Sequence, residues 1–143
     1  MGAIQPLMEG MEKRYFDGYD WIVRLNPEVL IKDDAWLWAQ MADPQTNALV
    51  VWCTRGRIHT DFTAFRVSAL EPHRFMLNTS QLSKAHNAET HMTESLANIL
   101  SHAASYANVT ENNTKECRVS NSSSPVVHVN ELLHQCPDYF KNA

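Results

Sequence analysis

Two short segments of the sequence place polar side chains capable of chemistry within apolar surroundings. The first, residues 20–31, sets Asn26 and Glu28 between two apolar stretches. A carboxylate that emerges at the carboxyl end of a buried strand lies where open α/β sheets bind ligands. The segment therefore predicts a ligand site at Asn26 and Glu28. The alternative is a turn whose polar side chains only face solvent.

The second segment, residues 58–66, embeds His59, Asp61 and Arg66 in an otherwise apolar strand. Because an isolated buried charge is costly, a buried Asp61 needs either a partner or a chemical task. It can accept hydrogen bonds from backbone donors, or it can act as a base or as the acceptor of a substrate hydroxyl. His59 and Arg66 are the candidate substrate-binding residues beside it.

Further candidates lie near the beginning of a long helix and in the last apolar strand. Glu89 is a catalytic candidate, although a carboxylate in the first turn of a helix also suits the positive end of the helix dipole. The spacing from His86 to His91 is not the i,i+4 pair of a zinc protease helix. His128 stands alone in the strand 125–129, where a histidine is either hydrogen-bonded in the core or a ligand.

The cysteines and glycosylation sequons bear on the compartment. Cys117 and Cys136 flank a loop-and-strand segment and can form a disulfide; the alternative is three free thiols in a reducing compartment. No Cys-x-x-Cys pair is present in the sequence, which argues against a cysteine-built zinc site. Candidate N-glycosylation sites are Asn78, Asn108, Asn112 and Asn121. Glycosylated loops of a secretory-pathway protein would explain them, and so would a plain Asn/Ser-rich loop.

Length, charge and hydrophobicity exclude several classes of protein. A chain of 143 residues allows one domain, and 44% hydrophobic with 20% charged residues rules out wholesale disorder. The net charge of −4 argues against nucleic acid as the main partner. The longest apolar run, 48–53, is far shorter than the roughly 18–20 residues that span a bilayer. We therefore expect no membrane span in this chain.

Alternating strand and helix patterns predict an α/β fold, with a mixed sheet and flanking helices. The expected strands are 19–25, 29–31, 48–53, 58–67, 74–77 and 125–129, and the expected helices are 35–42, 87–106 and 130–136. Phe62 and Phe65 should lie on different faces of their strand. The expected organisation is an N-terminal extension (1–18), an α/β domain (19–136) with an exposed polar loop (108–124), and a C-terminal tail (137–143).

Three sequence blocks carry a resemblance to a known family. They are residues 19–34, residues 58–66, and Cys-Arg-Val at 117–119 followed by Ser-Pro-Val-Val-His-Val at 124–129. These blocks resemble a group of algal and protist proteins that are in turn similar to GT-A-type glycosyltransferases. The resemblance implies a partial GT-A-like domain that transfers a sugar from a nucleotide-sugar donor to a glycan or protein acceptor.

The resemblance also implies roles for individual residues. In GT-A enzymes an Asp-x-Asp motif at the end of a central strand holds a divalent metal against the donor diphosphate. Here Asn26-Pro27-Glu28 occupies the matching place, with Asn in place of the first Asp. Glu28 and His128 are then the expected ligands of Mn²⁺ or Mg²⁺, which neutralises charge on the departing diphosphate. Asp61 is expected to face the acceptor sugar, as base or as hydroxyl acceptor.

One departure from the family pattern keeps a second interpretation open. A GT-A domain normally begins with a βαβ unit that binds the nucleotide, and only 18 residues precede the expected first strand here. The chain is then either the acceptor-side part of a longer transferase of the secretory pathway (Golgi or ER lumen), or a soluble intracellular protein. In the second case it is a non-catalytic interaction or scaffold subunit with a protein partner. Exposed tryptophans would favour the subunit.

Overall fold

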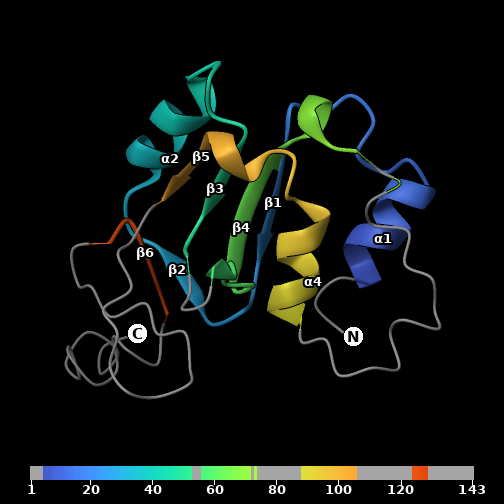
Figure 1. Ribbon diagram of the computed structural model, residues 1–143. Coiled ribbons are helices and arrows are strands. Elements are labelled where there is room, and N and C mark those ends of the chain that lie inside the picture. The colour runs from blue at the N-terminus through green and yellow to red at the C-terminus, as the bar shows by residue number, and fades with distance from the viewer. Residues whose placement is uncertain (1–4, 53–55, 72, 74–87, 106–123, 129–143) are drawn as a thin grey trace.

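The computed structural model describes residues 5–52, 56–71, 73, 88–105 and 124–128, and Figure 1 shows how they are arranged. The elements in chain order are helix α1 (Gln5–Glu12), strands β1 (Trp21–Leu25) and β2 (Val29–Ile31), helix α2 (Asp34–Ala42), strands β3 (Ala48–Val50) and β4 (Phe62–Arg66), the 3-10 helix η2 (Val67–Ala69), helix α4 (Ala88–Ser95), the 3-10 helix η4 (Leu100–His102), and strands β5 (Ala103–Ser105) and β6 (Val126–His128).

The strands form two sheets. In the larger sheet the order is β1-β4-β3-β5, with β4 antiparallel to both β1 and β3, and β5 parallel to β3. Strands β2 and β6 form a separate antiparallel pair. The larger sheet is therefore mixed, and the predicted α/β class with flanking helices is confirmed.

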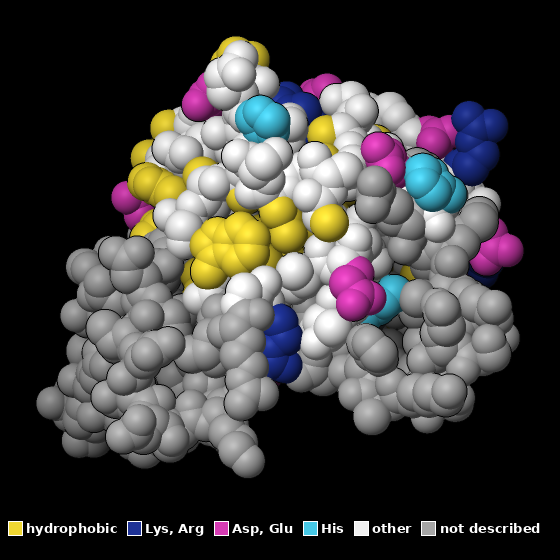
Figure 2. Space-filling model, in the orientation of Figure 1, with side chains coloured by type: hydrophobic (Ala, Val, Ile, Leu, Met, Phe, Trp, Pro, Cys, Tyr) yellow, Lys and Arg dark blue, Asp and Glu magenta, His cyan; other side chains and the backbone are white. Residues whose placement is uncertain are grey.

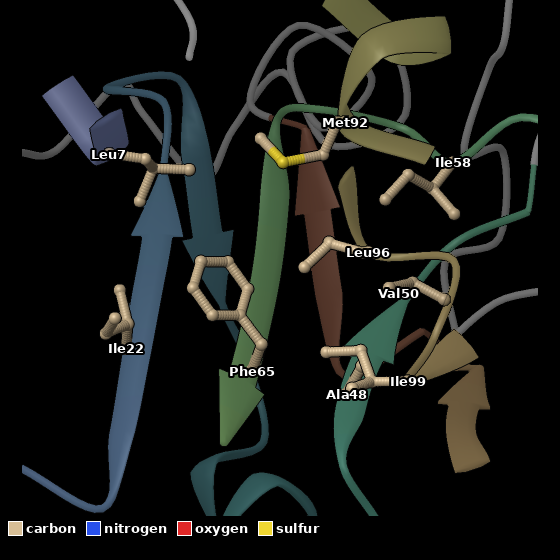
Figure 3. Close-up of a cluster of buried hydrophobic side chains, with 9 residues drawn as sticks. All are labelled: Leu7, Ile22, Ala48, Val50, Ile58, Phe65, Met92, Leu96 and Ile99. Carbon is tan, nitrogen blue, oxygen red and sulfur yellow. The ribbon is translucent and has the colours of Figure 1, made fainter. Parts of the chain in front are cut away.

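The alternation of side chains along β4 places the two halves of the core. Phe65 is fully buried on the face covered by α1 and α4, and Phe62 is fully buried on the opposite face with Leu37 of α2. The prediction that the two phenylalanines lie on different faces is confirmed. Figure 3 shows the first of these clusters, formed by Leu7, Ile22, Ala48, Val50, Ile58, Phe65, Met92, Leu96 and Ile99.

Helix α2 follows the sequence prediction closely. The Oδ1 atom of Asp33 accepts a hydrogen bond from the backbone N–H of Trp36 at 3.0 Å, which caps the helix. The helix ends before Asp43-Pro44, as expected from the restriction that a proline imposes on the residue before it. Leu37 is buried, and Trp36 and Met41 pack against the same cluster.

The long helix expected over 87–106 is wrong in its second half. Helix α4 ends at Ser95, and residues 103–105 form β5 beside β3. The apolar positions Met92, Leu96 and Ile99 are buried as predicted. However, the edge of β3 needs hydrogen-bond partners, and the pairing with β5 supplies them. Tertiary pairing thus outweighs the local preference for helix.

The N-terminal segment, expected as an extension, contains a helix that packs on the core. Leu7 of α1 is 4% exposed and joins the cluster around Phe65. Gly10 lies directly on the ring of Phe16, and a Cβ atom at Gly10 would overlap that ring. A glycine is therefore required where the helix meets the loop that follows it.

Several expectations fall outside the described residues. They are the strand 74–77, the helix 130–136, residues 108–123 of the polar loop, the cysteines Cys53, Cys117 and Cys136, and the sequons at Asn78, Asn108, Asn112 and Asn121. Among the residues that are described, no helix combines the length and the apolar character needed to cross a membrane.

Replacement of Thr63 by Val should stabilise the fold. Thr63 in β4 is fully buried, and its hydroxyl has no hydrogen-bond partner among the described residues. Val keeps the shape and removes the desolvated hydroxyl, so we expect a gain of about 1 kcal/mol in the free energy of unfolding. Thermal or urea denaturation measures it.

The matched control is Thr93→Val, because the Thr93 hydroxyl accepts a hydrogen bond from the backbone N–H of Ile58 at 2.9 Å. This control should lose stability by roughly 1 kcal/mol or more, since a buried amide then lacks its acceptor. A loss of stability in Thr63→Val as well would contradict this account of β4.

Candidate functional site

The register of β1 and β4 brings Asn26 and Asp61 together. Leu25 pairs with Phe62 at the end of the two strands, so the next residues outward, Asn26 and Asp61, face each other. The backbone N–H of Asn26 donates to the Asp61 carbonyl oxygen at 2.8 Å, and the Asn26 side-chain Nδ2 donates to Asp61 Oδ1 at 2.7 Å. The two predicted segments therefore meet in direct contact.

His59 lies beside the Asp61 carboxylate. The backbone N–H of Asp61 donates to His59 Nδ1 at 3.1 Å, and the same Nδ1 is 3.6 Å from Asp61 Oδ2. Because Nδ1 accepts this hydrogen bond, the neutral ring carries its proton on Nε2. The His59 and Asp61 side chains are 14% and 23% exposed, so both reach solvent without lying fully in it.

Arg24 adds a positive charge to this group. Its Nη2 donates to Asn26 Oδ1 at 2.9 Å. Burial lowers the pKa of Arg24, and the negative charges of Asp61 and Glu28 partly offset that shift. The guanidinium remains charged at any ordinary pH. We refer to Arg24, Asn26, His59 and Asp61 as the Arg24–Asp61 cluster.

Sequence reasoning missed Arg24, although the signal was present. Arg24 is a cation within an apolar strand, two residues before Asn26. Residues two positions apart share a face of a strand, so the side chain at position 24 lies next to the one at position 26. A search of β1 for i,i+2 polar pairs would have found it.

Of the two expected metal ligands, Glu28 lies near the cluster. Glu28 acts electrostatically on Arg24, and Val29, which follows it, pairs with His128 in the β2–β6 sheet. The structure does not describe the side chain of His128. Among the described residues, no three His, Cys, Asp or Glu side chains are grouped so that they could hold a metal ion. The described residues therefore do not by themselves make a metal site.

Arg66 lies at the opposite end of β4 from Asp61, and its side chain holds the end of α2. The guanidinium donates to the carbonyl oxygens of Met41, Asp43 and Thr46 at 2.9–3.2 Å. It also stacks on the ring of Trp21, 4.8 Å from the ring centroid. The structure thus separates Arg66 from the other candidate substrate-binding residues and gives it a structural task.

Glu89 belongs to the first turn of α4, which packs on the sheet face that holds Phe65. The structure does not describe its side chain, so its role as a catalytic candidate stays a prediction. The same helix contributes a buried pair, in which Ser95 Oγ is 3.4 Å from His91 Nε2. Both side chains are buried among the core residues of α4, so this pair is part of the core.

The chemistry available to the Arg24–Asp61 cluster follows from its groups. A carboxylate, an amide, an imidazole and a guanidinium lie in one hydrogen-bonded network at the end of β1 and β4. Together they supply donors and acceptors for hydroxyl groups, and a positive charge for an anion. The cluster is therefore suited to a ligand that carries hydroxyl groups and phosphate.

Asn26 and Asp61 should be energetically coupled. Asn26 is hydrogen-bonded to the charged groups of both Arg24 and Asp61. In a double-mutant cycle of Asn26→Ala and Asp61→Ala we expect a coupling of about 1–2 kcal/mol in unfolding free energy. Denaturant unfolding of the four proteins measures it.

The control cycle combines Asn26→Ala with Asp17→Ala, because Asp17 is an exposed residue that pairs with Arg14 in the N-terminal segment. These two changes should add to within about 0.5 kcal/mol. Equal coupling in both cycles would mean that the Asn26–Asp61 contact is absent in solution.

Arg66→Lys should destabilise the fold by about 1–2 kcal/mol. A lysine keeps the charge but cannot reach the three carbonyl groups with a planar set of donors, nor stack on Trp21 in the same way. Arg14→Lys is the matched control, since that side chain is 80% exposed in a surface ion pair. Thermal denaturation should separate the two variants, and equal melting temperatures would refute the role of Arg66.

Comparison of the chain with protein-family models, with curated proteins and with solved structures found no match. The function must therefore be argued from the site itself. A fold class alone hosts many unrelated activities, whereas a set of side chains at fixed distances limits the chemistry. Among the described residues, the Arg24–Asp61 cluster with Glu28 beside it is the group of side chains whose chemistry indicates a function.

Proposed function

We propose that this chain is a glycosyltransferase-like protein that binds a nucleotide-sugar donor at the Arg24–Asp61 cluster. It would transfer the sugar to a glycan or protein acceptor. The observation that carries the proposal is the direct contact between Asn26 and Asp61. These residues come from two of the three sequence blocks on which the resemblance to GT-A-type enzymes rests.

The groups of the cluster suit the parts of such a ligand. Asp61 offers carboxylate oxygens and Asn26 an amide group to sugar hydroxyl groups, and Arg24 offers a charge to the diphosphate. The partial exposure of Asp61 and His59 leaves the carboxylate within reach of a ligand. Partial burial at the same time strengthens the electrostatic interactions of the site.

In the transfer step, the acceptor hydroxyl oxygen forms a bond to the anomeric carbon of the sugar. The bond from that carbon to the diphosphate breaks, and the nucleoside diphosphate leaves with the electron pair. In an inverting reaction Asp61 takes the proton of the acceptor hydroxyl. In a retaining reaction an oxygen of the leaving diphosphate would take that proton, and Asp61 would accept a hydrogen bond from the sugar.

Mn²⁺ or Mg²⁺ remains part of the proposal, with Glu28 and His128 as the ligands. When bound, the metal would balance charge on the diphosphate. Because the described residues do not group three ligands, we derive no step through it. The nucleotide experiment therefore includes an arm without metal.

A second candidate function is supported by exposed aromatic side chains. Trp38 on α2 is 68% exposed, and Tyr15 and Tyr19 before β1 are 64% and 66% exposed. Large aromatic side chains in solvent are typical of surfaces that bind other proteins. The alternative is therefore a non-catalytic interaction or scaffold subunit. It predicts that nucleotides leave the thermal stability of the chain unchanged.

Nucleoside diphosphates should raise the melting temperature of the chain by roughly 5–10 °C. A ligand at about 100 times its Kd adds roughly 2.7 kcal/mol to stability, because it binds only the folded state. The measurement is a thermal melt with a panel of nucleoside diphosphates and nucleotide sugars. Each is tested with Mn²⁺, with Mg²⁺ and with a chelator. Release of nucleoside diphosphate from the nucleotide sugars measures transfer or hydrolysis.

Asp61→Asn and Glu28→Gln remove a charge with little change of shape and should reduce the shift or the release of diphosphate. Glu12→Gln is the matched control, since Glu12 is exposed at the end of α1. The proposal fails if no nucleotide shifts a cooperative melt, or if Asp61→Asn behaves like Glu12→Gln.

A further inference from the structure

A second candidate site, which shares Arg24 with the Arg24–Asp61 cluster, lies between α1 and the edge strand β1. A pocket of about 460 Å³ opens there. Its lining comes from α1, from the loop that follows it and from β1: Pro6, Leu7, Gly10, Tyr15, Phe16, Ile22, Val23, Arg24 and Leu25. In Figure 1, α1 stands on the side of the molecule where β1 ends the sheet. The pocket is mainly apolar, and Arg24 is the one charged side chain among these lining residues.

At the open edge of the sheet, the backbone of β1 has N–H and C=O groups in position to bond another strand. Asp20 and Asn26 form backbone hydrogen bonds with Val67 and Asp61 of the β4 side, so in an antiparallel ladder the even residues of β1 bond to β4. The odd residues Trp21, Val23 and Leu25 then direct their N–H and C=O groups to the open edge. Among the described residues, no strand pairs with that edge.

The side chains around this edge are also apolar. Val23 and Leu25 are 41% and 47% exposed on the face opposite to Ile22, although they belong to the sheet. A strand edge with unpaired backbone groups and exposed apolar side chains is a template for an added strand. Proteins usually protect such an edge with charges, proline or a covering segment.

We propose that β1 binds an extended peptide of a partner protein as an additional strand, in the groove beside α1. Main-chain hydrogen bonds to Trp21, Val23 and Leu25 would hold the peptide. One of its side chains would be apolar and enter the pocket against Phe16 and Ile22. An acidic side chain two positions along the peptide lies on the same face and complements Arg24.

The charge of Arg24 favours a peptide of a partner protein over a second copy of this chain. The edge strand of a second copy, Trp21–Leu25, has no acidic side chain to pair with Arg24 and would bring a second arginine to the same edge. Residues of α1 and of the loop that follows it line the pocket together with β1. This inference does not depend on the nucleotide-sugar proposal.

The test uses two synthetic peptides, acetyl-Thr-Val-Thr-Glu-Thr-amide and acetyl-Thr-Glu-Thr-Val-Thr-amide, because the strand can run in either direction. They are titrated into the full chain with NMR detection. We expect one of them to bind at millimolar concentration or below. It should slow hydrogen exchange at the amides of Trp21, Val23 and Leu25. The Gln analogue of that peptide should bind severalfold more weakly, since it lacks the charge for Arg24.

Val23→Pro distinguishes strand addition from other modes of binding. Proline removes the outward N–H of Val23 without removing a β1–β4 hydrogen bond, and edge strands tolerate proline at such positions. We expect binding to weaken about tenfold or more, the loss of about one hydrogen bond with added steric hindrance. Val23→Thr is the matched control, because it keeps the N–H and the β-branched shape, and it should bind as the parent chain does.

Three outcomes would overturn the proposal. In the first, neither peptide binds at millimolar concentration. In the second, Val23→Pro, with an unchanged melting curve, binds as tightly as Val23→Thr. In the third, the chain without peptide is a dimer by sedimentation and Val23→Pro makes it monomeric, which would assign the edge to a second copy. If Val23→Pro lowers the melting temperature, the binding test is repeated with Leu25→Pro. The hydrogen-exchange rates of the Trp21 and Val23 amides in the parent chain then also show whether the peptide binds as an added strand.

Discussion

The antiparallel register of β1 and β4 is the constraint on which the rest of this structure depends. β4 is one of the two inner strands of the larger sheet, and its residues from Phe62 to Phe65 are fully buried. A shift of one residue would exchange Phe62 and Phe65 between the two faces and leave both clusters of the core mismatched. The same shift would separate Asn26 from Asp61. Core packing therefore fixes the geometry of the candidate site.

The site is formed where this constraint ends. One residue beyond the last strand pair, a backbone hydrogen bond still joins Asn26 to Asp61, and their polar side chains also meet there. Arg24 is taken partly out of water there, which costs free energy, and Asp61 with Glu28 offsets part of that cost. An arrangement of this kind is stable only because the sheet holds it in place. The sheet thus fixes the relative positions of the polar groups of the cluster.

The two edges of the larger sheet differ. At one edge, β5 pairs with β3 and satisfies its backbone groups, so the expected helix ends early. At the other edge, β1 exposes apolar side chains to solvent and lines a pocket together with α1. Figure 2, drawn in the orientation of Figure 1, shows hydrophobic side chains reaching the surface among polar ones on the face in view. An edge left in this state is the place where another chain can be added.

Local patterns in the sequence determined the elements whose causes are local. The Asp33 cap and the Asp43-Pro44 stop defined α2, the apolar run from Ala48 predicted a buried strand, and the alternation in β4 placed its two phenylalanines. The tertiary structure alone decided what depends on distant partners. Helix α4 ends at Ser95 because residues 103–105 pair with β3, and the guanidinium of Arg66 donates hydrogen bonds to carbonyl groups at the end of α2. The tertiary structure also brought Arg24 to Asp61. Spacing along the chain reports which residues share a face, whereas contacts between segments far apart depend on hydrogen bonds and burial that exist only after the sheet has formed.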